Sequence, residues 1–169
     1  MRVRVISGRY GGRFLDAPDT DRTHPMGERI RNAIFNRIGS DIEGAIVLDA
    51  FAGSGVVGLE ALSRGAKQVP LIDRDRVAQK VIRANIALLG CESRAHLVAA
   101  PVASWSERNL DILFDYIFVD PPYYDLQLST VERLISHLKP DGTMILSHPG
   151  KGEALSGVKG IVVVDNRSY

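Results

Sequence analysis

The feature that most constrains the fold is an apolar strand that runs into a glycine-rich turn and then into a helix. Residues 46–51 read IVLDAF, residues 52–55 read AGSG, and residues 56–62 place apolar side chains at helical spacing. A helix start offers unpaired N–H groups and a partial positive charge, and Gly53 and Gly55 let a ligand approach the backbone closely. These parts predict a nucleotide-binding βα unit.

An acidic residue, Asp49, stands at the end of that strand beside the glycines. The spacing of Gly53, Gly55 and Gly58 nearly matches the dinucleotide fingerprint, which alone is weak support for NAD. A carboxylate here is a poor neighbour for a pyrophosphate and a good one for a cation, and S-adenosylmethionine carries an ammonium and a sulfonium. We therefore expect S-adenosylmethionine at this turn, against Asp49 and the adjoining Ala50 and Phe51.

The next strand, residues 68–73, also ends in an acid, Asp73. It lies about 20 residues beyond the glycine turn, where a ribose-binding carboxylate is expected in such folds. The alternative is a helix N-cap, for which Asp75 is the better candidate because a helix is predicted over residues 76–89. We expect Asp73 and its neighbour Arg74 to contact the cofactor.

A second motif, Asp120-Pro121-Pro122-Tyr123, follows the apolar strand predicted over residues 114–119. The two prolines fix φ and lack N–H donors, so the corner offers acceptors, the Asp120 carboxylate and backbone carbonyls, beside an aromatic face. Such a corner suits an exocyclic amino group on a flat ring. Taken alone, the motif is equally explained as a turn-forming proline pair.

Strands and helices alternate along the rest of the chain. Strands are predicted at 95–99, 142–147 and 161–164, and helices at 26–38 and 126–138. This order predicts an α/β, Rossmann-like fold with a mainly parallel sheet flanked by helices. Its ligands bind outside the carboxyl ends of the strands, which would bring Asp49, Gly53, Asp73, Ala100 and Asp120 around one crevice.

The N-terminal stretch is basic although the whole chain of 169 residues has a formal net charge of only +1. Residues 1–37 hold eight arginines and four acids, and the first arginines alternate with apolar residues as in a hairpin with one charged face. One interpretation is that this charged face of the hairpin is simply exposed to solvent. Contact with RNA phosphates is favoured, because clustered arginine marks nucleic-acid binding, and Arg9, Arg13 and Arg29 are the candidates.

Composition narrows the class of protein. The chain is 45% hydrophobic and large enough for one core, and its single cysteine, Cys91, excludes an internal disulfide. No apolar run reaches the length of a membrane helix, and no Cys/His cluster has metal-ligand spacing. We expect a cytoplasmic protein with no membrane partner and no metal.

Four segments carry a family resemblance: residues 6–13, 24–36, 48–66 and 114–123. With them the chain resembles the RsmD-type 16S ribosomal RNA guanine-N2 methyltransferases, which belong to the class I enzymes dependent on S-adenosylmethionine. The resemblance implies methylation of a guanine N2 in 16S rRNA of the small ribosomal subunit, or of an assembly intermediate. Asp120, Pro121, Pro122 and Tyr123 would be the catalytic residues.

From the charge pattern and the order of elements we expect an N-terminal extension for RNA contact (1–40) before a catalytic domain (41–169), in a monomeric enzyme. The family adds a seventh, antiparallel strand that would begin where residue 169 stands, and it often has an acid or amide where this chain has Ala100. Adenine would then be read by backbone groups. The alternatives are an amino methyltransferase acting on adenine N6 of DNA or RNA, a catalytically silent RNA-binding homologue, and an NAD-dependent oxidoreductase, which Asp49 disfavours.

Overall fold

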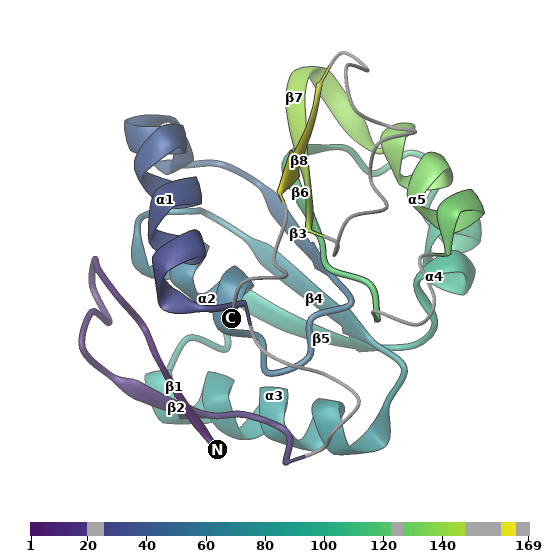
Figure 1. The fold of residues 1–169 in the computed structure, drawn as a ribbon. Coiled ribbons are helices and arrows are strands. Elements are labelled where there is room, and N and C mark those ends of the chain that lie inside the picture. The colour runs from purple at the N-terminus through teal and green to yellow at the C-terminus, as the bar shows by residue number, and fades with distance from the viewer. Residues whose placement is uncertain (20–25, 123–126, 148–159, 165–169) are drawn as a thin grey trace.

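The computed structural model describes residues 1–19, 26–122, 127–147 and 160–164. They form a two-stranded hairpin and a six-stranded sheet flanked by helices (Figure 1). In chain order the elements are β1 (Arg2–Arg4), β2 (Phe14–Asp16), α1 (Glu28–Ile38), the 3-10 helix η1 (Gly39–Ile42), β3 (Val47–Ala50), α2 (Val56–Ser63), β4 (Val69–Asp73), α3 (Arg76–Leu89), β5 (Ala95–Ala99), α4 (Val102–Arg108), β6 (Phe114–Val119), α5 (Leu128–Ile135), β7 (Leu138–Ser147) and β8 (Ile161–Val164).

The large sheet has the strand order β5-β4-β3-β6-β7-β8, and every neighbouring pair is parallel. The predicted Rossmann-like α/β fold is confirmed. Parallel strands place all their carboxyl ends along one edge, and the order reverses between β3 and β6, which is where ligands bind in such sheets. The seventh strand of the family, which we expect to be missing here, would fall beyond the described residues.

The sheet is covered on both faces, which explains why its strands read as nearly continuous apolar runs. Val47 joins the hydrophobic cluster formed with α1, α2, α3 and the hairpin. Leu48 and Ala50, pointing the other way, join the cluster formed with α4 and α5. Figure 1 shows these two groups of helices on opposite sides of the sheet. Because side chains alternate along a strand, Asp49 faces the α2 side.

The N-terminal extension packs as an integral part of the α2 side. Its Val5 and Leu15 lie in the same hydrophobic cluster as strand β3. The carboxylate of Glu60 on α2 is fully buried and accepts bonds from the backbone N–H groups of Ile6 and Ser7, at 2.9 and 3.1 Å. The same carboxylate pairs with Arg31 of α1. The single buried carboxylate of Glu60 therefore connects the segment between β1 and β2, and also α1, to the helix that follows the glycine turn.

Close backbone contact fixes the extension further. A Cβ on Gly8 would lie 2.1 Å from the carbonyl oxygen of Ser63, and Gly8 has a φ of +86°. Around this glycine, the Arg9 N–H donates to the Ser63 carbonyl and the Tyr10 N–H to the Ser63 hydroxyl, both at 2.8 Å. The chain can wrap over the end of α2 only because residue 8 lacks a side chain.

The structure differs from the sequence-based expectations at three elements. The helix α4, which begins after Pro101, was not predicted. The helix predicted over 126–138 is α5 and ends at Ile135. The strand predicted over 142–147 begins at Leu138, because Leu138 already pairs with Phe114. Between these residues and Thr143, which pairs with Tyr116, the register of β7 shifts at a bulge.

Among the described residues, no helix has both the length and the apolar content that crossing a bilayer requires.

Candidate active site

Three aspartates stand at neighbouring strand ends on the carboxyl edge of the sheet. Asp49 lies in β3, Asp73 ends β4, and Asp120 directly follows β6. Burial raises the pKa of Asp49 well above its usual range, the charges of Asp120 and Asp73 raise it further, and the bond from the Gly58 N–H opposes the rise. The negative charges of Asp73 and Asp120 therefore oppose ionisation of Asp49, and a positive charge placed beside Asp49 would favour its ionised form.

Asp73 shapes the glycine turn. One carboxylate oxygen accepts from the Gly53 N–H and the other from the Asp75 N–H, both at 2.8 Å. Burial raises the pKa of Asp73 in spite of these bonds, while the exposed Arg74 lowers it. Asp75 is the cap of α3, accepting from the Ala78 N–H at 2.9 Å, as predicted.

The glycine turn is open where a ligand would lie. Gly53 and Gly55 adopt left-handed φ values of +61° and +81°, and Phe51 does so at +57°. A Cβ on Gly53 would meet no atom of the described residues within 4 Å. A Cβ on Gly58, by contrast, would lie 3.0 Å from Asp49 and from Leu71. Gly58 thus serves close packing of α2 on the sheet, while Gly53 faces free space.

The proline corner begins at Asp120, whose side chain is only partly exposed. Burial raises the pKa of Asp120 to about 7, and a hydrogen bond with Ser147 opposes the rise. Pro121 is buried and Pro122 half-buried, so the corner is held rigidly against the sheet. Tyr123, the fourth residue of the predicted motif, lies outside the described residues.

Ala100, at the end of the third strand along this edge, has its backbone N–H in use. It donates to the Val98 carbonyl at 3.1 Å. The candidate Ala50 is fully buried in β3. Ala50 ends β3 and Ala100 follows β5, two parallel strands of the same sheet with β4 between them, so both residues lie at the same edge as the aspartates.

The candidate RNA-binding arginines are exposed on the N-terminal extension. The Arg9 guanidinium lies 5.7 Å from the centre of the Tyr10 ring, and Arg13 donates to the Leu88 carbonyl at 3.0 Å. Arg29 lies on the exposed face of α1. Another arginine of the basic stretch, Arg31, is buried beside Glu60 and does not face solvent.

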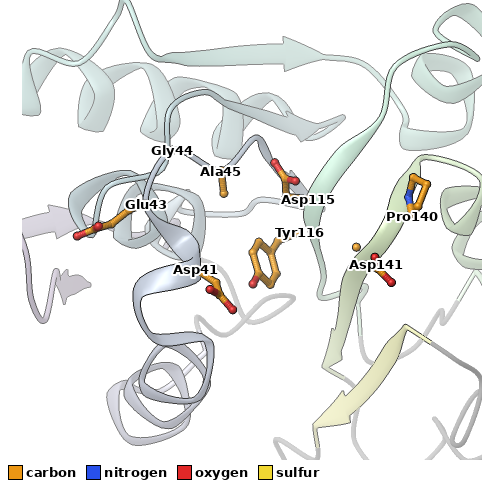
Figure 2. A pocket seen from close by; sticks show the side chains of 9 residues that line it. Asp41, Glu43, Gly44, Ala45, Asp115, Tyr116, Pro140 and Asp141 are labelled. Atoms are coloured by element: carbon orange, nitrogen blue, oxygen red, sulfur yellow. The ribbon is translucent and has the colours of Figure 1, made fainter.

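A cavity of about 360 Å³ opens at the opposite edge of the sheet (Figure 2). It is lined near the starts of β3, β6 and β7, and the acids Asp41, Glu43, Asp115 and Asp141 surround Tyr116 there. Figure 2 shows the Tyr116 ring between the two sides of the hollow. Its acidic lining repels phosphate, and it is remote from the carboxyl edge, so it does not belong to the candidate site.

Two polar residues near the site were not singled out from the sequence. Ser147 ends β7 and bonds Asp120; its position after the apolar residues 144–146 was the available signal. Asn85 is buried in α3 and bonds both the glycine turn and the hairpin. No local pattern marks Asn85, because its partners lie 31 and 69 residues away. In the parts of the chain that the structure describes, no three His, Cys, Asp or Glu side chains are grouped to hold a metal ion.

Comparison with known proteins places the chain among methyltransferases. A family model described as conserved hypothetical protein 95 matches residues 3–169. YlbH of Bacillus subtilis strain 168, which carries a provisional rRNA methyltransferase name, is 34% identical over 172 residues, covering 99% of this chain and 94% of YlbH. Ribosomal RNA small subunit methyltransferase D of Escherichia coli K12 is 35% identical over 141 residues, covering 83% of this chain and 69% of that protein.

Solved structures with a similar fold also carry methyltransferase names. The provisionally named methyltransferase yhhF of Escherichia coli superposes with a TM-score of 0.77 at 31% identity, covering 89% of this chain and 84% of that one. The methyltransferase-like protein SMU.776, solved in complex with SAH, has a TM-score of 0.62 over 76% of this chain and 36% of its own. At 18% identity the second likeness concerns the fold alone.

Proposed function

The chain belongs to the family described as conserved hypothetical protein 95, and we propose that it transfers a methyl group from S-adenosylmethionine to the exocyclic N2 of a guanine in 16S rRNA. The observation that carries this proposal is the set of three aspartates at adjacent strand ends beside the glycine turn, where the backbone at Gly53 is open. A site of that kind favours a cationic nucleotide-like ligand over a pyrophosphate. The relatives named as rRNA methyltransferases supply the substrate class.

The cofactor-binding role falls to the glycine turn and the two acids beside it. Gly53 leaves room for close approach of the cofactor to the backbone, and Gly55, where a Cβ would lie 3.1 Å from Leu71, lets the turn pack on the sheet. Ala50, Phe51 and Arg74 would complete the cofactor site around them. A carboxylate oxygen has two lone pairs, so Asp73 keeps acceptor capacity for ribose hydroxyls while it binds the Gly53 N–H. Ala100 follows β5, the strand beside β4, and we place the adenine ring of the cofactor there.

The substrate amine would bind at the proline corner. Asp120 and the Pro121 carbonyl accept its two hydrogens, and Tyr123 stacks on the base, a contact worth roughly 1–3 kcal/mol that offsets part of the cost of unstacking. Guanine N2 is a weak nucleophile because its lone pair is delocalised, so positioning supplies much of the rate. The bound cofactor would supply an electrophilic methyl group to N2, and the proton that N2 loses would pass to the Asp120 carboxylate or to solvent.

Recognition of RNA would use the exposed arginines of the extension, Arg9, Arg13 and Arg29. Residues 1–40 would serve RNA contact and residues 41–169 catalysis. We propose that the substrate is the small ribosomal subunit or an assembly intermediate, methylated by a cytoplasmic monomer. Methylation of adenine N6 in DNA or RNA, or RNA binding without catalysis, would be the outcomes that exclude this proposal.

The test combines binding with product mapping. Calorimetry should show that the protein binds S-adenosylhomocysteine and does not bind NAD. Labelled S-adenosylmethionine should then mark 16S rRNA in unmodified small subunits, and mapping should place the methyl group on a guanine N2. Asp120→Ala should keep S-adenosylhomocysteine affinity within a few-fold and abolish transfer. A fully active Asp120→Ala enzyme, or a methyl group found only on adenine, would refute the assignment.

A further inference from the structure

We propose that Asn85 on α3 is a positioning residue that couples cofactor binding at the glycine turn to the N-terminal hairpin. The inference rests on the proposed function, since it takes the glycine turn as the cofactor site. Asn85 is 1% exposed. Its Nδ2 donates to the carbonyl oxygens of Ser54 and Asp16, both at 2.9 Å, and its Oδ1 accepts from the Asp16 N–H at 3.0 Å.

The chemistry of the side chain leaves little freedom. The two Nδ2 hydrogens are used by two carbonyls, and Oδ1 is used by an N–H. Turning the amide over would place Oδ1 against both carbonyls and Nδ2 against a donor, so the observed orientation is the one that satisfies every group. Aspartate could not donate both bonds, and an apolar residue would leave buried partners unsatisfied.

The two partners belong to different parts of the proposed machinery. Ser54 stands between Gly53 and Gly55, and Asp73 holds the Gly53 N–H on the other side. The turn is therefore fixed from two directions, by a strand end and by α3. Asp16 is the last residue of β2, and the hairpin lies along α3 in Figure 1.

Asn85 is thus a direct bridge between the two segments. A ligand that holds the turn in place also holds the Ser54 carbonyl, and through it the amide that positions Asp16. Coupling of this kind is reciprocal: whatever orders the hairpin, RNA included, should tighten cofactor binding. An enzyme built in this way would favour the cofactor when the RNA-facing segment is engaged.

Hydrogen exchange with and without S-adenosylhomocysteine tests the bridge. In the wild-type enzyme, saturating ligand should slow exchange in residues 2–17 by at least about threefold. Asn85→Ala should abolish that response and weaken S-adenosylhomocysteine binding by about tenfold in calorimetry, in the range typical of coupled sites. Asn85→Asp, which keeps the acceptor for the Asp16 N–H but cannot donate to both carbonyls, should behave similarly. Asn32→Ala is the control, because Asn32 bonds Arg64 and not the turn.

The outcomes separate the two proposals. If the wild-type enzyme does not bind S-adenosylhomocysteine, the proposed function fails and this inference fails with it. If it binds and exchange in residues 2–17 is unchanged, only the bridge is refuted, and this measurement needs no variant. A ligand response that survives in Asn85→Ala, or one that is lost equally in Asn32→Ala, also overturns the role of Asn85.

Discussion

Replacing Asp120 by Asn should stabilise the ligand-free enzyme at pH 8 while it abolishes methyl transfer. The pKa of this carboxyl is raised from 3.8 to about 7 by burial. Each pH unit between the two values corresponds to about 1.4 kcal/mol, so keeping the carboxylate ionised in the folded state costs at most about 4 kcal/mol. Asn has nearly the same shape, remains neutral and can still accept a bond from Ser147.

The sign of the pH dependence follows from proton binding. The folded state holds the Asp120 proton more tightly than the unfolded state, so this residue contributes stability in full below about pH 4. That contribution is lost as the pH rises to about 7. The advantage of Asp120→Asn should therefore be largest at pH 8, fall to about 2 kcal/mol at pH 5, and vanish near pH 4.

Urea unfolding at pH 5 and pH 8 measures both differences. Asp111→Asn, at an exposed aspartate, is the control and should stay within about 0.5 kcal/mol of the wild type at either pH. An Asp120→Asn enzyme that is less stable than the wild type at pH 8, or equally favoured at both pH values, would refute the reasoning. So would full methyltransferase activity in that variant.

Three further outcomes are expected. Gly8→Ala should destabilise the protein by at least about 3 kcal/mol more than Gly12→Ala in urea unfolding, because both glycines have a φ of +86° but only a Cβ at residue 8 meets another atom; equal losses would show that backbone strain alone decides. Glu60→Gln should cost about 3–5 kcal/mol by the same measurement, since it strands a buried guanidinium, and a loss under 1 kcal/mol would contradict the buried pair. Reversing the charges of Arg9 and Arg13 should weaken binding to 16S rRNA and flatten its salt dependence in titrations at several salt concentrations, and unchanged slopes would remove these residues from the interface.

The parts of the fold that could be predicted are those whose signals lie in residues close together in the sequence. The helix α3 was predicted with its observed bounds and with Asp75 as its cap, because apolar periodicity and the capping residue are both local signals. The helix α4 has seven residues and buries only a few side chains, among them Val102 and Trp105, so its periodic signal was too short to detect. The bulge before Gly142 depends on pairing with β6, which no local pattern records.

The candidate site divides in the same way. Strand-end acids and turn glycines could be predicted because parallel strands share an edge, so Asp49 and Asp73 converge although far apart in sequence. The side-chain partners could not. A helical Asn such as Asn85 looks like any solvent-facing polar residue, and Arg31 looked like its exposed neighbours until its burial beside Glu60 was known. Each owes its role to a residue that only the folded chain brings near.

The pairing of Arg31 with Glu60 limits how the protein can be re-engineered. A shortened version that starts after α1 would lose Arg31 and the backbone donors of Ile6 and Ser7, so the buried Glu60 carboxylate would keep Arg64 but lose these partners. It would also expose the hydrophobic surface that the hairpin had covered. Chimeras that exchange N-terminal segments between related enzymes would lose the same ion pair unless the arginine and the glutamate were exchanged together. The natural junction for grafting a new RNA-recognition module is therefore the exposed outer surface of the hairpin and not the boundary at residue 40.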